Sequence, residues 1–135
     1  MSMKITEIQI GDWVYNKFHK KPIRITPYDF FTHGHRSDGE QYLLVNSEPA
    51  IGRDYDPIPI TTEILEKNGF LPKDGYYCIV DDYYGVSIDE YSDSIWRVEY
   101  ESLEMNLPIS RVLISYVHEL QHFLALIGIS KQIVL

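Results

Sequence analysis

The sequence predicts an α+β fold built mainly from short antiparallel strands. Three segments rich in Tyr, Val, Ile and Trp follow one another, separated by short acidic turns, at residues 75–82, 84–90 and 94–102. Such a series predicts an antiparallel β-meander, with residues 108–115 as a further strand. In the third segment Trp96, Val98 and Tyr100 alternate with other residues, so we expect them on one largely buried face.

A short helix of about two turns is expected before the meander, from its terminal signals. Thr61 can cap the N-terminus, and Glu63 in the first turn favours the positive end of the helix dipole. Gly69 suits the left-handed residue after the helix, where Phe70 would fold back on Leu65.

The N-terminal part predicts an SH3-like small β-barrel or a curled sheet. Residues 5–16 alternate apolar and polar side chains, with Gly11-Asp12 at a break, as at the first strand of many such barrels. Residues 20–26 and 41–46 are two further strand candidates. Residues 28–40 are rich in turn-forming residues and predict a loop.

The proline-rich connection at residues 49–59 is the best internal boundary in this chain of 135 residues. It divides the sequence into an SH3-like β-rich lobe, residues 1–56, and an α+β lobe, residues 57–135. A chain of this length also fits one continuous domain.

Composition indicates an ordinary soluble protein, with 44% hydrophobic and 24% charged residues. Neither a secretion signal nor an apolar run of about 18 residues is visible, so we expect a cytoplasmic protein. The single cysteine, Cys78, cannot form an internal disulfide and is expected to be a small buried apolar residue.

The net charge of −8 is unevenly distributed, because residues 61–135 hold 5 basic and 12 acidic residues. An acidic surface repels phosphate backbones and anionic lipid, so we expect neither a direct nucleic-acid partner nor a membrane partner. The acidic run is either a solvated face or a docking surface for a basic protein. The candidate docking residues combine tyrosines and acids: Asp81, Asp82, Tyr83, Tyr84, Asp89, Glu90, Tyr91 and Asp93.

Near the C-terminus the segment YVHELQHFLALIG predicts a helix and contains an H-E-x-x-H motif. In zinc peptidases the two histidines, here His118 and His122, hold the metal and the glutamate, here Glu119, is the general base. On a helical wheel both histidines lie opposite the apolar face, and no third ligand follows them. We therefore interpret the motif as coincidental, with Ser115 as N-cap and a structural His118 at the strand-to-helix corner.

Three pieces of the sequence, IGDWVY, PIPITTEILEKNGF and YVHELQHFLALIG, together resemble an uncharacterised family. Its members are small proteins of gut Bacteroidetes, their phages and mobile elements. The resemblance implies a barrel-like N-terminal part, a capped central helix, a sheet and a packed final helix. In the family pattern position 122 is usually Asn and position 119 varies. This chain departs from the pattern by the inserted segment DFFTHGHRSDGE.

The expected function is that of a non-enzymatic binding or accessory protein of phage or mobile-element origin. It would contact a protein partner through its Tyr-rich acidic surface and would need no cofactor. One alternative is a zinc-dependent hydrolase or metallopeptidase that uses the H-E-x-x-H segment. A further alternative is an acidic mimic of nucleic acid.

Overall fold

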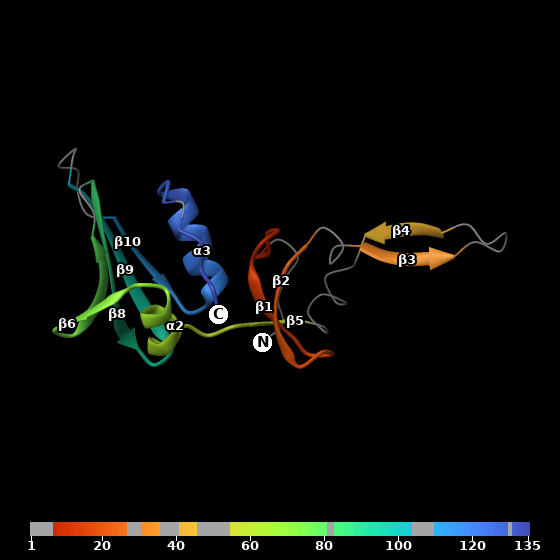
Figure 1. Cartoon of the computed structure of the whole chain (residues 1–135), viewed down its shortest axis with the longest axis horizontal. Coiled ribbons are helices and arrows are strands. Elements are labelled where there is room, and N and C mark those ends of the chain that lie inside the picture. Colours follow the sequence, from red (N-terminus) through yellow and green to blue (C-terminus); the bar gives the residue numbers. More distant parts are fainter. Residues whose placement is uncertain are drawn as a thin grey trace. The chain divides into compact units, whose positions relative to one another are not determined.

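The computed structural model describes seven stretches of the chain: residues 7–26, 31–35, 41–45, 55–80, 83–103, 110–129 and 131–135. The chain divides into two compact units, residues 1–58 and 59–135. Most of their elements are labelled in Figure 1. The fold is mixed α+β, with strands predominating and all strand pairs antiparallel. No helix of the described residues is long and apolar enough to cross a membrane.

The first unit contains a three-stranded sheet and a separate two-stranded hairpin. The sheet has the order β2-β1-β5 and is formed by β1 (Trp13–Asn16), β2 (Lys21–Arg24) and β5 (Tyr55–Pro57). The hairpin consists of β3 (Phe31–His35) and β4 (Gln41–Val45). The described residues thus form an open sheet, not a closed barrel. The prediction of a loop over residues 28–40 is wrong for β3, because the backbone of β3 pairs with that of β4 in a regular antiparallel ladder.

The Gly-Asp turn before β1 is built as its residue types require. Gly11 has a φ of +93°, a conformation that costs glycine little. The Asp12 carboxylate is buried and accepts a hydrogen bond of 2.8 Å from the Gln9 backbone N–H. The Ile25 backbone N–H donates to the Asp12 carbonyl at 2.8 Å, which ties β2 to the turn. Beside this turn lies a small core of four buried residues: Ile8, Val14, Ile25 and Tyr55.

The second unit is a five-stranded meander with two helices. Its strands pair in chain order: β6 (Leu71–Lys73), β7 (Tyr76–Val80), β8 (Tyr84–Ser92), β9 (Ile95–Ser102) and β10 (Ser110–Ile114). The antiparallel meander expected from the sequence is confirmed. The short strand β6 was not expected; it pairs with β7 across a turn in which Gly75 has a φ of +82°.

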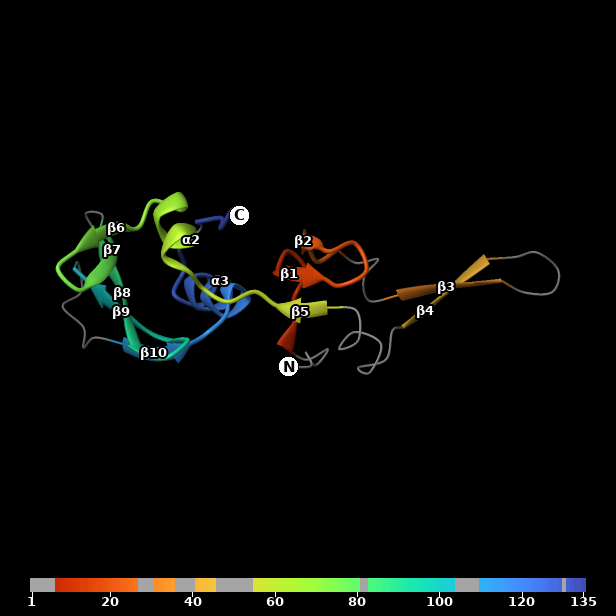
Figure 2. The same ribbon diagram turned by 90° about the horizontal axis from the view of Figure 1, so that it is seen from below.

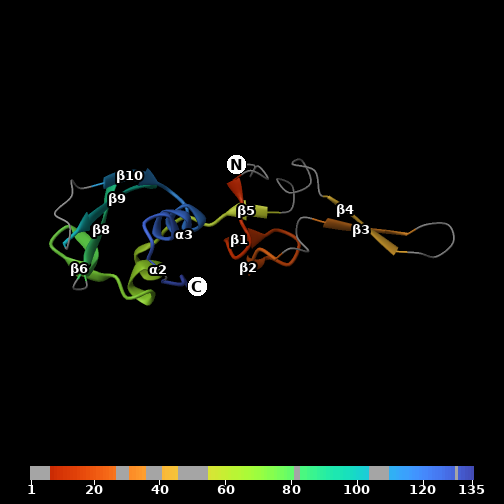
Figure 3. The ribbon, with the colours of Figure 1, turned by 90° about the horizontal axis from the view of Figure 1, so that it is seen from above.

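One face of this sheet, the inner face, is covered by α2 (Thr62–Lys67) and α3 (Val117–Leu126), as the views in Figures 2 and 3 agree. Trp96 and Val98 lie on the inner face with exposed fractions of 6% and 0%, as expected. Tyr100 is half-buried. The helices contribute Leu65, Leu120 and Leu124, all of which are almost completely buried.

The ends of α2 confirm the predicted signals. The Thr61 hydroxyl accepts from the Ile64 backbone N–H at 3.2 Å, as an N-cap does. Gly69 has a φ of +83°, and the Phe70 backbone N–H donates to the Leu65 carbonyl at 3.0 Å, which closes the helix.

The C-terminal tail is tied to the end of α2 by Asn68. The Asn68 side-chain amide donates to the Val134 carbonyl at 2.8 Å, and its oxygen accepts from the Val134 N–H at 2.7 Å. The same amide nitrogen lies 2.8 Å from the Ile64 carbonyl oxygen. Asn68 is 5% exposed and Ile133 is 1% exposed, so this tail completes the core of the second unit.

Candidate functional site

The H-E-x-x-H segment opens α3, but its glutamate has a structural role. The Glu119 carboxylate oxygen Oε1 accepts hydrogen bonds from the backbone N–H groups of Ser115, at 3.0 Å, and Tyr116, at 3.1 Å. The N-cap is Tyr116, so the predicted N-cap Ser115 is wrong by one residue and Glu119 occupies position N3. A glutamate at N3 that accepts from the N-cap N–H is half of a capping box. An oxygen engaged in this way is poorly placed to act as a general base.

The two histidines occupy different environments. His118 is 5% exposed, which contradicts the solvent-facing position given by the helical wheel. It lies in the first helical turn, and its ring stacks on that of Tyr116 with a distance of 5.9 Å between the ring centres. His122 is half-buried, and its ring meets that of His118 edge-on at 5.6 Å. Across the described stretches, no three His, Cys, Asp or Glu side chains gather in a group that could hold a metal.

The described members of the predicted Tyr/acid surface lie at several places along β8 and in the turn after it. Tyr83 is 62% exposed and precedes β8, whereas Tyr91 is 58% exposed and lies at an irregularity near its other end. A strand rises about 3.4 Å per residue, so these two tyrosines are separated by roughly 25 Å. Asp81 and Asp82 lie outside the described residues.

The remaining predicted residues divide between the two faces of β8. Tyr84 is half-buried and shares the inner-face register with Val86 and Ile88, and Glu90 follows in the same alternation as an exposed residue. Asp89 falls on the opposite, outer face, and Asp93 is exposed in the turn before β9.

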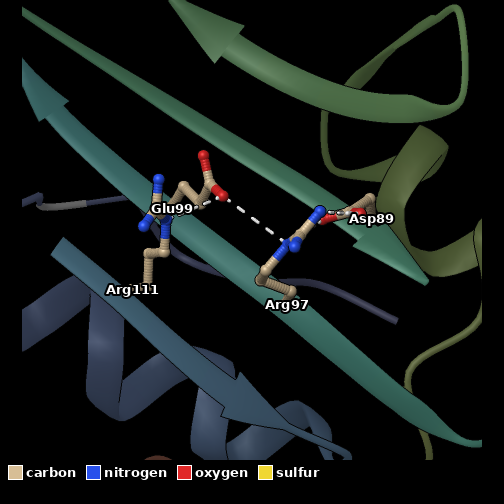
Figure 4. A network of polar contacts seen from close by, with 4 residues as sticks. All are labelled: Asp89, Arg97, Glu99 and Arg111. Carbon is tan, nitrogen blue, oxygen red and sulfur yellow. Dashed lines mark hydrogen bonds and ion pairs between the residues drawn. The ribbon is translucent and has the colours of Figure 1, made fainter. Parts of the chain in front are cut away.

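The outer face of the meander carries a charge network across β8, β9 and β10 (Figure 4). Arg97 binds both carboxylate oxygens of Asp89, with N–O distances of 3.1 and 2.7 Å. Glu99 accepts from Arg111 at 3.1 Å and lies 3.5 Å from Arg97. The guanidinium of Arg97 also lies 6.0 Å from the Tyr91 ring centre. The hydrogen bonds and negative charge of Asp89 raise the pKa of Arg97, which keeps it protonated.

Beside this network the outer face is hollowed. The hollow has a volume of about 610 Å³ and extends from the β6–β7 turn to β9. Small residues form part of its lining: Cys78 and Ser87, which are register partners, and Gly85, which is paired with Glu101. Carboxylates at its rim include Asp74 and Glu101, and neither has an ion pair within the described part of the chain. The hollow therefore combines small residues with an excess of negative charge, because four carboxylates line it against two cations, Lys73 and Arg97.

Sequence reasoning placed Cys78 correctly as a buried residue but missed the organising roles of Arg97, Glu99 and Arg111. A signal was present, because Arg97, Glu99 and Glu101 alternate with the buried residues of β9 and must share its other face. Arg111 could not be placed beside Glu99 without the register of β10. No known protein family, no curated protein and no solved structure gives a significant match to the chain.

Proposed function

We propose that the protein is a non-enzymatic binding module that docks a basic segment of a partner protein on the outer face of its meander. The observation that carries this proposal is the hollow, with its small residues and the carboxylates of Asp74 and Glu101. A lysine or arginine side chain matches such a site, because its aliphatic stem packs on apolar surface while its charged end meets a carboxylate.

The apolar side chains around the hollow support a protein partner. Val80, Leu71 and Leu113 are 65%, 63% and 50% exposed. By register Val80 faces outward beside Gly85, Leu71 beside Cys78 and Leu113 beside Arg97. Of the three, Val80 lines the hollow, and exposed apolar side chains on the same face as a polar hollow are typical of protein interaction surfaces.

The network on the outer face argues against a nucleic-acid mimic. Asp89 and Glu99 alternate with Arg97 and Arg111, so their charges cancel locally. A mimic needs a row of uncompensated negative charges spaced like phosphates. The unmatched charge is instead concentrated at the hollow, which favours recognition of one or two basic side chains.

For the first unit, we infer a curled sheet of SH3-like type. Its support is the Gly-Asp turn that leads into β1 and the small core beside that turn. The resemblance of the three sequence motifs supports an accessory role in a phage or mobile element, and the composition supports a cytoplasmic location.

The docking site can be tested by NMR with a synthetic peptide of alternating arginine and leucine. We expect shift changes to cluster on Val80, Gly85, Ser87 and Glu101, and binding to weaken steeply above a few hundred millimolar salt. Glu101→Lys should reduce the affinity at least tenfold, because it places a like charge at the rim.

The matched control is Glu66→Lys, which makes the same change of charge on an exposed residue of α2. It should bind the peptide as the wild type does. Equal weakening by both variants would show that only the net charge matters and would overturn the proposed site.

A further inference from the structure

The β1–β2 hairpin of the first unit has a charge opposite to that of the chain. From Trp13 to Thr26 the sequence contains four cations and no acid, although the whole chain has a net charge of −8. The cations are Lys17, Lys20, Lys21 and Arg24, and His19 lies among them. Of these, Lys17 pairs with Asp56 at 3.3 Å. The hairpin therefore carries a local excess of positive charge.

Aromatic side chains lie on the solvent side of the sheet, where Arg24 is the register partner of Trp13. Lys21 lies at the start of the edge strand β2, on the side of Val14, and Lys17 and Lys20 lie in the turn. Val14 and its register partner Ile23 pack into the core, so Trp13 and Tyr15 belong to the other face of β1. Tyr15 is 36% exposed and Trp13 is half-buried. Trp13 and Tyr15 are two residues apart on one strand face, so their backbone positions are separated by about 7 Å.

The tip of the hairpin presents a third aromatic ring, that of Phe18, which is 83% exposed. The turn is ordered: the Asn16 side-chain oxygen accepts from the His19 backbone N–H at 2.8 Å, and Lys20 adopts a φ of +54°. The Phe18 ring meets the His19 ring edge-on at 5.0 Å. A large apolar ring held out on an ordered turn is a surface prepared for contact.

Arg24 links the basic and aromatic sides of this surface. Its Nε donates to the Gly11 carbonyl at 3.2 Å, and its guanidinium lies 5.7 Å from the Trp13 ring centre. A guanidinium has five N–H donors, so those not used by Gly11 can bind a phosphate.

We propose that this surface, formed by Trp13, Tyr15, Phe18, Lys20, Lys21 and Arg24, binds single-stranded nucleic acid. Aromatic rings on a strand face and its adjoining turn provide platforms on which unpaired bases stack. The flanking cations neutralise the phosphates between those bases. The sequence-based expectation of no direct nucleic-acid partner followed from the acidic half of the chain, and the proposal for this hairpin departs from it.

The same residues fit an anionic membrane or an acidic protein less well. Membrane anchoring needs more apolar insertion than one phenylalanine and a few lysines provide. An acidic peptide would use the cations but would have no stacking partner for Trp13 and Tyr15. Aromatic rings spaced along one strand face are matched by a chain that carries a planar group on every residue.

The test uses the two tryptophans as built-in probes. Trp96 is 6% exposed and belongs to the second unit, whereas Trp13 lies on the proposed surface. Titration with oligothymidylate of about 12 nucleotides should quench Trp13 fluorescence and shift its indole N–H signal in NMR spectra, leaving the Trp96 signal unchanged. The logarithm of the affinity should fall with the logarithm of salt concentration with a slope of about −2, from three cations at about 0.7 each.

Variants separate stacking from charge. Phe18→Ala should weaken binding about tenfold without changing the salt slope, since one stacked base is lost. Lys20→Glu with Lys21→Glu should reduce both the affinity and the slope. The matched control, Lys67→Glu with Lys131→Glu, makes the same charge change in the second unit and should bind as the wild type does.

Four results would overturn the proposal. They are an unshifted Trp13 indole signal, equal affinity of Phe18→Ala and the wild type, and equal binding of single-stranded and duplex DNA, which would show phosphate contact alone. The fourth is binding to vesicles of anionic phospholipid or to polyglutamate with no binding to oligothymidylate, which would identify a membrane or an acidic protein as the partner class. The readouts concern the first unit, so they do not depend on peptide docking at the meander.

Discussion

The two faces of the meander in the second unit are built from the same strands but differ in kind. On the inner face, Val86, Ile88 and Val98 are at most 1% exposed beneath the helices. On the outer face, the register partners Asp89 and Arg97 remain partly open to solvent, with side-chain exposures of 24% and 40%. Alternate residues of each strand therefore build the core on one face, and the residues between them form the solvent-exposed surface on the other.

The largest effect is expected from Trp96→Ala on the inner face. The change removes a large buried side chain and should lower the free energy of unfolding by about 3–5 kcal/mol. Leu113→Ala on the outer face is the control, because Leu113 is 50% exposed and should change stability by no more than about 0.5 kcal/mol. Urea unfolding followed by circular dichroism measures the free energy of unfolding of both variants. Similar losses in the two would contradict the distinction between the faces.

Asn68→Ala tests how the inner side of the unit is closed. It removes three hydrogen bonds and leaves the Val134 backbone groups without their side-chain partner, so a loss of about 2–3 kcal/mol is expected. Asn68→Asp keeps the oxygen that accepts from the Val134 N–H and removes the amide donors. Its loss in the free energy of unfolding should therefore come from the lost donor bonds alone. Amide exchange at Val134 should speed up much more in Asn68→Ala than in Asn68→Asp; equal exchange in both would show that the tail is held by Ile133 alone.

The histidine pair tests α3, which covers the inner face. His118→Ala should lower stability by about 1–2 kcal/mol because the side chain is buried, whereas His122→Ala should cost less than about 0.5 kcal/mol. We also expect no stoichiometric zinc by elemental analysis after expression with added zinc. A zinc pair acts as a unit, so one zinc per chain that disappears in both single variants would restore the hydrolase interpretation.

The smallest effect is expected from the outer network. Arg97→Gln removes a two-point contact with Asp89, yet exposed ion pairs contribute only about 0.2–1 kcal/mol. The loss should shrink as salt rises, which thermal unfolding at two salt concentrations can measure. A cost above about 2 kcal/mol that is insensitive to salt would mean that the network is part of the fold.

The fold was predictable where local chemistry decides it. Thr61, Gly69 and the alternation of β9 are local signals, and they suffice to predict the capped helix and the buried face. Register was not predictable, because it depends on which strands meet: the outer network needs Arg111 opposite Glu99, and no local rule supplies that pairing. The wheel misplaced His118 because it treats a helix as isolated, whereas in the folded unit His118 is buried and its ring stacks on that of Tyr116.

The motifs that suggested a family have structural roles here. Gly11 and Asp12 form a turn, Thr61 caps the N-terminus of α2, and Gly69 follows its C-terminus. Residues of this kind stabilise turns and helix ends. For this reason the motifs carry no information about a partner, and the surfaces of β1–β2 and of the meander have to supply it.

The bond between Asn68 and Val134 has a consequence for synthesis on the ribosome. The two residues are 66 positions apart, so at roughly 5–20 residues per second α2 waits about 3–13 s for its last partner to be translated. During that time the meander emerges before α3, with Trp96 and Val98 exposed to solvent. The nascent chain is therefore most vulnerable to aggregation and to chaperone capture between the completion of β9 and the emergence of α3 and the tail.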